Sequence, residues 1–325
     1  MRNKPLKKLA TVFALITLAS CSNSTETVTE PTAETTTDSV VADLPVIAVT
    51  YSVIGNIVSQ LVGDKAAVSV IIPDGQDPHD FQPSAKDIET INNAALVVSN
   101  GLEFEEGLEE VLENIADSGG KIFMVGEHIT VRKIEDDGDD HGDDHGDGHE
   151  DDDHDHKHTG GDPHVWLSPA TMLEMLPALT TALSQATGAD LSTQATALTT
   201  QLQDLDGQVE SIIKGLGECN LVSGHDELGY FADRYGCKVI GAIIPSFTTT
   251  SEATAGELAE LKRLVEQYKV RAIFTGLGTS PDTANQLAKE LGIRAVTLST
   301  HYLDNAANYQ EFILNLTNQI AEALS

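Results

Sequence analysis

Short apolar runs rich in β-branched residues alternate with helical stretches from residue 45 to the end of the chain. Near-continuous apolar runs such as Val46-Ile47-Ala48-Val49 are typical of strands that are covered on both faces of a sheet. Their alternation with helices predicts parallel α/β sheets. The predicted strands are Pro45–Val49, Val68–Ile72, Ala95–Ser99, Lys121–Val125, Asn220–Ser223, Lys238–Ile243, Arg271–Thr275 and Arg294–Leu298.

A long helical region separates the first four strands from the last four. Ser168 followed by Pro169 is a typical N-cap and first helical residue, and a second helical pattern runs from about Asp190 to Lys214. At about 1.5 Å per residue that second helix would be nearly 40 Å long, enough to cross a whole domain. We therefore expect an α/β lobe over residues 44–187, a rigid connecting helix within residues 188–216 and a second α/β lobe over residues 217–325.

The N-terminus has the pattern of a secretory signal over residues 1–20. Basic residues precede the apolar run Leu9–Leu18, which is too short to span a bilayer, and small residues lead to Cys21. This junction resembles the lipobox of bacterial lipoproteins, in which Cys21 would be acylated; the alternative is an ordinary cleaved signal. Residues 21–43 suit a flexible tether. We expect a body that is lipid-anchored to a bacterial membrane, in the periplasm or at the cell surface.

Charge and composition narrow the function classes. The 325 residues include 19 Lys and Arg against 51 Asp and Glu, for a net charge of −32, which makes binding to nucleic acid unfavourable. A hydrophobic fraction of 40% excludes a wholly disordered chain. Neither a Walker-type phosphate loop nor a Gly-x-Ser-x-Gly elbow is present.

Six of the eleven histidines lie in one acidic segment. Residues 135–158 hold thirteen acidic residues, six His and one Lys, so within the loop 135–160 we expect a solvated, disordered stretch. Imidazoles beside carboxylates favour several weak, interchangeable metal sites, and the alternative is a solubilising tract with incidental His. The histidines of this predicted secondary metal loop are His141, His145, His149, His154, His156 and His158.

Four other histidines share a different position. His79, His164, His225 and His301 each follow a predicted strand or lie where a loop meets a helix, two in each expected lobe. Ligands of open α/β sheets bind beyond the carboxyl ends of the strands, so the four predict one site in a cleft between the lobes. Imidazole ligands favour Zn²⁺, whereas Mn²⁺ and Mg²⁺ prefer carboxylates and water.

Cys219 and Cys237 form an even pair for an oxidising compartment. Each precedes an apolar run, and in adjacent parallel strands they would occupy equivalent starting positions about 4.8 Å apart. We expect a disulfide, with two buried free thiols as the alternative.

Four segments in order carry a family resemblance: PDGQDPHDFQPSAKDI, VVSNGLEFEEGL, GDPHVWLSP and SGHDELGYFADRYG. They resemble the ZnuA-like zinc-binding lipoproteins, the solute-binding components of metal ABC importers, over about residues 44–325. The resemblance implies two α/β lobes joined by a rigid helix, one metal in the cleft, and an ABC permease with its ATPase as partners. It also implies that His79, His164 and His225 are ligands.

The fourth ligand departs from the family pattern. Where relatives often have an acidic residue after the last strand, this chain has LSTHYLDN, so His301 or, as the lesser candidate, Asp304 takes that position. His225 stands where manganese-transporting relatives tend to have Glu, which favours zinc. The expected function is therefore high-affinity capture of Zn²⁺ for import, without catalysis.

Three rival functions remain open from the sequence. They are an Mn²⁺ or Fe²⁺ binding protein of the same architecture, a metal-buffering adhesin, and, as a remote alternative, a zinc hydrolase with Glu227 as its base.

Overall fold

The computed structural model describes residues 44–133 and 161–325. The expected signal peptide, Cys21, the tether over residues 21–43 and the acidic segment lie outside the described residues. The same holds for the six histidines of the predicted secondary metal loop, His141, His145, His149, His154, His156 and His158. Across the two described ranges, no helix combines the length and the apolar character needed to cross a bilayer.

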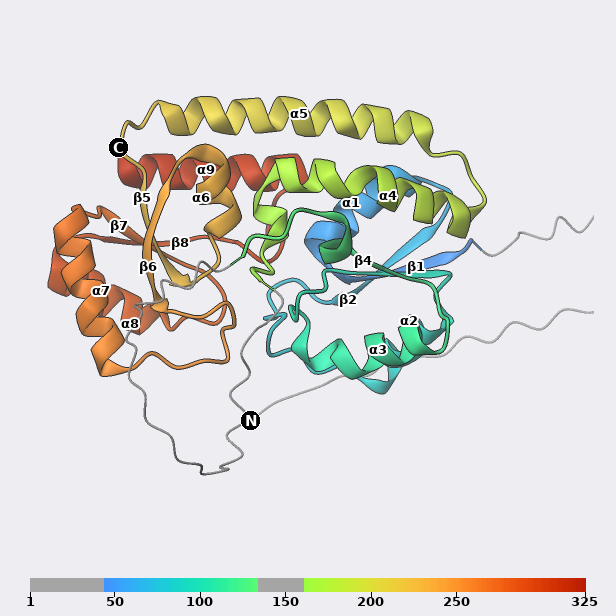
Figure 1. The fold of residues 1–325 in the computed structure, drawn as a ribbon, viewed down its shortest axis with the longest axis horizontal. Helices are drawn as coiled ribbons and strands as arrows, with labels where there is room; N and C mark the ends of the chain where they lie inside the picture. Colours follow the sequence, from blue (N-terminus) through green and yellow to red (C-terminus); the bar gives the residue numbers. More distant parts are fainter. Residues whose placement is uncertain (1–43, 134–160) are drawn as a thin grey trace, which may run out of the picture. The chain divides into compact units, whose positions relative to one another are not determined.

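The first half of the described chain folds around a four-stranded parallel sheet in the order β2-β1-β3-β4 (Figure 1). β1 pairs with β2 on one side and with β3 on the other, and all but the first residue of β1 are buried. Helices α1 and α4 lie on one face of the sheet and α2 and α3 on the other (Figure 1). The elements are β1 Val46–Tyr51, α1 Ser52–Val62, β2 Ala67–Ile72, α2 Ala85–Asn93, β3 Leu96–Ser99, η1 Glu106–Leu108, α3 Glu109–Asp117, β4 Ile122–Met124, η2 Val125–His128, η3 Val165–Leu167 and α4 Pro169–Thr187.

The second half contains another four-stranded parallel sheet, in the order β6-β5-β7-β8. The two helix-flanked parallel sheets confirm the predicted α/β class, and all eight predicted strands are present with ends that differ by at most two residues. The elements are β5 Asn220–His225, α6 Gly229–Tyr235, β6 Lys238–Ile244, α7 Ala255–Tyr268, β7 Ala272–Thr275, α8 Pro281–Leu291 and β8 Arg294–Thr297.

Local sequence signals account for several helix ends. α4 begins with Pro169 at its first position, where the missing N–H costs no hydrogen bond. Thr254 and Glu257 form a reciprocal capping box at the start of α7. α4 ends at Gly188 in the left-handed conformation, with φ of 68°, which a glycine adopts without a Cβ clash.

Helices α5 and α9 contact elements of both halves. α5 (Ser192–Lys214) packs against α1 and α4 and also against α6 and α9. α9 (Tyr309–Leu324) packs against α5, β7 and β8, and its first turn reaches α1, where the backbone N–H of Tyr309 donates to Asn56. Figure 1 shows α5 passing along both halves, with α9 beside it along the second half. Residues Asp43–Ser325 accordingly form one compact unit.

Cys219 and Cys237 are joined in a disulfide, with their Cα atoms 4.6 Å apart. They immediately precede β5 and β6, whose register places Asn220 opposite Lys238. The bridge therefore closes the amino ends of two adjacent parallel strands.

Candidate metal centre

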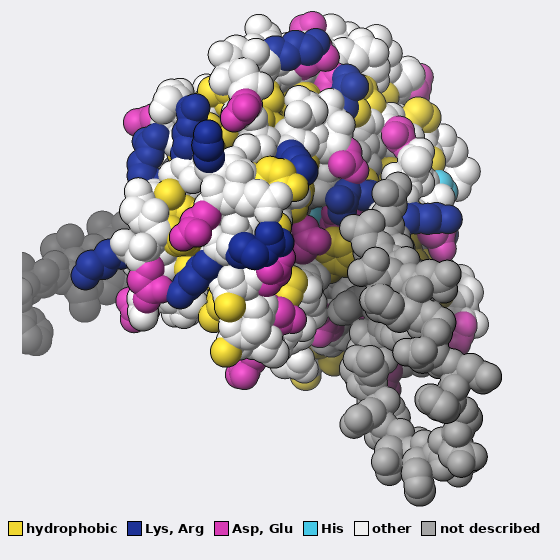
Figure 2. Space-filling model, turned by 60° about the vertical axis from the view of Figure 1, so that its left-hand side comes forward, with side chains coloured by type: hydrophobic (Ala, Val, Ile, Leu, Met, Phe, Trp, Pro, Cys, Tyr) yellow, Lys and Arg dark blue, Asp and Glu magenta, His cyan; other side chains and the backbone are white. Residues whose placement is uncertain are grey.

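Four histidines from four distant segments meet at the carboxyl ends of the two sheets. His79 follows β2, His164 precedes η3, His225 ends β5 and His301 follows β8. All are buried, with at most 2% of each residue exposed, and one ring nitrogen from each lies within 4.8 Å of the other three. On the face drawn in Figure 2, only traces of histidine appear among the charged side chains. The structure thus brings together all four histidines that the sequence places in one site.

The ring geometry suits a small tetrahedral ion. Ring centroids of the four histidines are 5.0 to 5.9 Å apart, and the Nε2 atoms of His164 and His225 are 3.1 Å apart. Tetrahedral bonds of about 2.0 to 2.1 Å put ligand nitrogens about 3.4 Å from one another. Drawing the most distant nitrogens to that spacing therefore needs a shift of at most about 1.4 Å, divided between two side chains.

Several ring nitrogens have no hydrogen-bond partner within the described part of the chain. Both nitrogens of His79 and the Nε2 of His301 are buried and accept or donate no hydrogen bond within the described residues. Buried polar atoms are rarely left without partners, because the loss of hydration is not recovered. A bound cation would satisfy the one lone-pair nitrogen that each neutral ring offers, since that nitrogen is a metal ligand.

Burial favours the neutral form of three of the four imidazoles. It lowers the pKa of His164, His225 and His301 well below the usual 6.5, and the neighbouring histidines lower it further. Unprotonated imidazole is the metal-binding form, so these three rings are ready for a cation at neutral pH.

Asp162 orients His164 from behind. One oxygen, Oδ1, accepts from the backbone N–H of His164 and lies 2.9 Å from its Nδ1. With the proton on Nδ1, the Nε2 lone pair points into the cluster. Burial raises the pKa of Asp162 to about 7, and the guanidinium of Arg132, 3.3 Å from Oδ2, opposes that rise. Arg132 also forms an ion pair with Asp233 of α6, which connects the Asp162–Arg132 pair to the second half.

The second pair of histidines shares a buried carboxyl group. Glu227 lies 3.9 Å from Nδ1 of His225 and 3.6 Å from Nδ1 of His301, and burial raises its pKa to about 8. The Oγ1 of Thr300 lies 2.9 Å from the same Nδ1 of His301. Thr300 approaches Gly276 so closely that a Cβ there would lie 2.7 Å from Oγ1, which explains a glycine at that position.

Aromatic rings form one wall of the cluster. Phe104 packs on His79 at 5.0 Å and on Trp166 at 4.7 Å between ring centroids. Trp166 lies 5.5 Å from His164, and its Nε1 donates to the carbonyl of Thr300. This wall keeps water from one side of the imidazoles and holds the two halves in contact.

Asp304 lies apart from the cluster. Its exposed side chain accepts from the side chain of the adjacent Asn305, and its backbone is left-handed, with φ of 53°. His301, rather than Asp304, therefore occupies the fourth position of the cluster.

Sequence reasoning missed Asp162 as a supporting residue, although a repeat marks it. Asp-Pro-His occurs twice, at residues 77–79 and 162–164. In both copies the Asp accepts from the backbone N–H of the His two residues later. This turn fixes the direction in which each histidine leaves the backbone.

Known proteins are similar to this chain in sequence and in fold. The family described as "Zinc-uptake complex component A periplasmic" matches residues 47–323. "Zinc-binding protein AdcA" of Streptococcus pyogenes is 28% identical over 247 residues, 74% of this chain and 47% of that protein. The "High-affinity zinc uptake system protein ZnuA" of Bacillus subtilis is 29% identical over 244 residues, 74% of this chain and 73% of that protein.

A solved structure has the same fold. It is the periplasmic zinc binding protein TroA from Treponema pallidum, with a TM-score of 0.72 and 22% identity, covering 87% of this chain and 99% of that one. The chain spans about half the length of the streptococcal relatives it matches.

Proposed function

Because the chain belongs to the ZnuA family of periplasmic zinc-uptake components, we propose that it captures Zn²⁺ outside the cytoplasmic membrane and delivers it to an ABC permease. The single observation that carries this proposal is the convergence of four buried imidazoles, with one nitrogen from each within 4.8 Å of the rest. Zinc here is cargo, and no bond in a substrate is made or broken.

The ligand set favours zinc over manganese and iron. His79, His164, His225 and His301 supply only imidazole nitrogens, which suit Zn²⁺, whereas Mn²⁺ favours carboxylate oxygen and water. The carboxyl groups of Asp162 and Glu227 lie behind the rings, on the Nδ1 side, so they support ligands rather than join them.

The same geometry argues against a zinc hydrolase. A catalytic zinc keeps an open coordination position for water, and four imidazoles fill a tetrahedral shell. Glu227 contacts the Nδ1 sides of His225 and His301, away from where an ion would bind, so it is badly placed as a base toward metal-bound water. We therefore assign the chain a binding role.

Capture would involve little closure. α5 and α9 both pack against the two halves, and Thr248 of the second half donates to Glu106, whose carboxylate lies 3.7 Å from Nδ1 of His79. Large hinge motion would break these contacts, so we propose that loading moves loops and that the permease promotes release.

We propose roles for the lipid anchor and for the acidic segment as well. Acylated Cys21 would hold the protein at the membrane, and the histidines of residues 141–158 would collect zinc weakly before it reaches the cluster. Labelling with a radioactive fatty acid tests the anchor, since a Cys21→Ser variant should take up no label.

Calorimetric titration of Zn²⁺ into the full chain tests the function. We expect one tight site and several weak ones, with only the weak ones left in His79→Ala. His128→Ala is the matched control, because His128 is exposed and stacks on Phe123 away from the cluster. A tight site that survives in His79→Ala, or disappears in His128→Ala, would refute the assignment.

Uptake needs a separate experiment. Bacteria that lack the protein should fail to grow in chelated medium and recover with the wild-type protein but not with His79→Ala. Normal growth without the protein would favour a buffer or adhesin over an importer component.

A further inference from the structure

The carboxyl group of Glu106 lies beside the buried histidine cluster and also reaches solvent. Carboxyl oxygens of Asp162, Glu227 and Glu106 lie 2.9 to 3.9 Å from ring nitrogens of the cluster. The side chains of Asp162 and Glu227 are 0% and 1% exposed, whereas 33% of the Glu106 side chain is exposed. Since each clustered histidine is at most 2% exposed, Glu106 can meet a hydrated cation before the imidazoles do.

The backbone places Glu106 against the loop that carries His79. Glu106 is the first residue of η1, directly before α3. A Cβ at the next residue, Gly107, would clash with the backbone carbonyl of Phe81, which lies two residues beyond His79. A glycine at position 107 therefore lets η1 approach this loop closely enough for Glu106 to reach the histidine.

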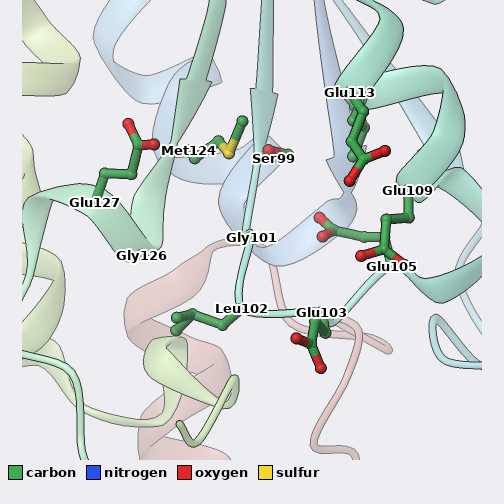
Figure 3. A pocket seen from close by; sticks show the side chains of 11 residues that line it. Ser99, Gly101, Leu102, Glu103, Glu105, Glu109, Glu113, Met124, Gly126 and Glu127 are labelled. Atoms are coloured by element: carbon green, nitrogen blue, oxygen red, sulfur yellow. The ribbon is translucent and has the colours of Figure 1, made fainter. Parts of the chain in front are cut away.

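The neighbouring acidic residues face a different space. Glu103, Glu105 and Glu109 line a cavity at the carboxyl end of β3, as Figure 3 shows, and Glu106 does not line it. Proximity to the histidine cluster is therefore a property of the Glu106 side chain, and the negative charge of this segment does not by itself account for it.

The distance between Glu106 and His79 suits a shared zinc ion. Oε1 of Glu106 lies 3.7 Å from Nδ1 of His79. Two ligand atoms on one tetrahedral zinc are about 3.4 Å apart, so one ion could bind both atoms after a shift of about 0.3 Å. Carboxylate oxygen and imidazole nitrogen are both zinc ligands, and water can fill the other positions on this exposed side.

No neighbour within the described residues fixes the tautomer of His79. Both of its ring nitrogens are buried without a hydrogen-bond partner there. His164 differs, because Asp162 lies 2.9 Å from its Nδ1 and favours a proton on that atom. Nδ1 of His79 can therefore carry the lone pair that a metal needs. A buried nitrogen without a partner is unfavourable, and an ion shared with Glu106 would satisfy it.

Thr248 of the second half orients the Glu106 carboxylate. Its Oγ1 donates to Oε1 of Glu106, and Thr248 itself is 5% exposed. A carboxylate oxygen has more than one lone-pair site, so the same oxygen can accept this hydrogen bond and bind a cation. The oxygen that lies near His79 is thus held in place before an ion arrives.

We propose that Glu106 and His79 form an entry site through which Zn²⁺ reaches the cluster, an inference that rests on the zinc capture proposed above. A hydrated ion first binds Oε1 of Glu106 and Nδ1 of His79 and keeps water at its other positions. The imidazoles of His164, His225 and His301 then replace the water and the carboxylate. Because Glu106 is absent from the final ligand set, it changes the rate of loading and not the affinity.

Stopped-flow mixing of Zn²⁺ with the full chain, followed by the fluorescence of Trp166, tests the proposal. Glu106→Gln should slow association about tenfold, because a neutral amide replaces the carboxylate ligand. Dissociation into excess chelator should slow by a similar factor, since the ion leaves by the same path. The affinity should therefore stay within about twofold of that of the wild-type chain.

Two control variants separate the carboxylate from its charge and from its hydrogen bond. Glu110 is exposed on α3, and Glu110→Gln makes the same change in net charge. An equal slowing in Glu110→Gln would overturn the proposal, because general attraction of cations would explain both variants. Thr248→Val removes the hydrogen bond to Glu106 and keeps the carboxylate, so association should change by less than about twofold. Slowing as large as in Glu106→Gln would show that the contact between the halves controls entry.

Equilibrium titration of the same variants separates the entry site from zinc capture itself. An unchanged association rate in Glu106→Gln would overturn the entry site and leave zinc capture intact. So would a loss of affinity at an unchanged association rate, because Glu106 would then support the loaded state. Absence of a tight site in the wild-type chain would overturn both proposals. Thermal unfolding of each variant checks that it is folded.

Discussion

The contact between Asp162 and His164 gives the sharpest prediction about metal affinity. In Asp162→Asn the side chain keeps its size but has a single acceptor oxygen. The native Oδ1 faces both the backbone N–H and the Nδ1 of His164, while Oδ2 faces Arg132. The NH₂ group of an asparagine would therefore face either the guanidinium of Arg132 or the protonated Nδ1 of His164. In both arrangements two hydrogen-bond donors face each other.

The expected loss is about 10- to 100-fold in zinc affinity, or about 1.4 to 2.7 kcal/mol, as is typical of residues that orient a metal ligand. The metal-free fold should change by less than about 1 kcal/mol, because burial already raises the pKa of Asp162 to about 7 and so tolerates a neutral group there. Binding and folding are thus separated in one variant.

Competition with a chelator of known affinity measures the effect, with Trp166 as the reporter. Trp166 is the one tryptophan of the chain and lies 5.5 Å from the His164 ring. Asp233→Asn is the control, because Asp233 also pairs with Arg132 but is largely exposed. An Asp162→Asn affinity within about twofold of wild type, or an equal loss in Asp233→Asn, would refute the reasoning.

Three further predictions follow from the site and its frame. Replacing His301 by Asp should lower the preference for Zn²⁺ over Mn²⁺ about tenfold in competition titrations, because a carboxylate suits manganese; an unchanged ratio would remove His301 from the ligands. The double change Cys219→Ser and Cys237→Ser should cost about 3 kcal/mol in denaturant unfolding for a separation of 18 residues, with zinc affinity unchanged because the bridge closes the strand ends opposite the cluster. Zinc affinity should fall as pH drops from about 8 to 6, because the cation favours the ionised forms of Asp162 and Glu227, whose pKa values burial raises to about 7 and about 8; titration in two buffers should show proton release that decreases in Glu227→Gln.

Much of the fold was predictable because its signals are local. The β-branched apolar run Val46–Tyr51 predicts β1, which is almost wholly buried. Ser168 and Pro169 predict the start of α4. The four histidines were predictable because each follows a strand or a loop at the same edge of a parallel sheet. The order of strands and helices along the sequence is enough to identify that edge.

The supporting contacts were not predictable in the same way. Glu227 touches both His225 and His301, and Thr300 reaches His301 because Gly276 leaves room. These contacts depend on how β5, β7 and β8 pack, which no local pattern encodes. The attachment of α9 to α1 through Tyr309 and Asn56 is likewise a tertiary contact, and it adds a further link between the two halves.

We propose that imidazoles from four distant segments share one zinc ion. Anomalous diffraction at the zinc edge, from crystals of the protein loaded with less than one equivalent of Zn²⁺, tests it most directly. We expect one strong peak about 2.0 to 2.1 Å from a ring nitrogen of each of His79, His164, His225 and His301. A peak bound to fewer than three of these rings, or to a carboxylate in place of His301, would contradict it.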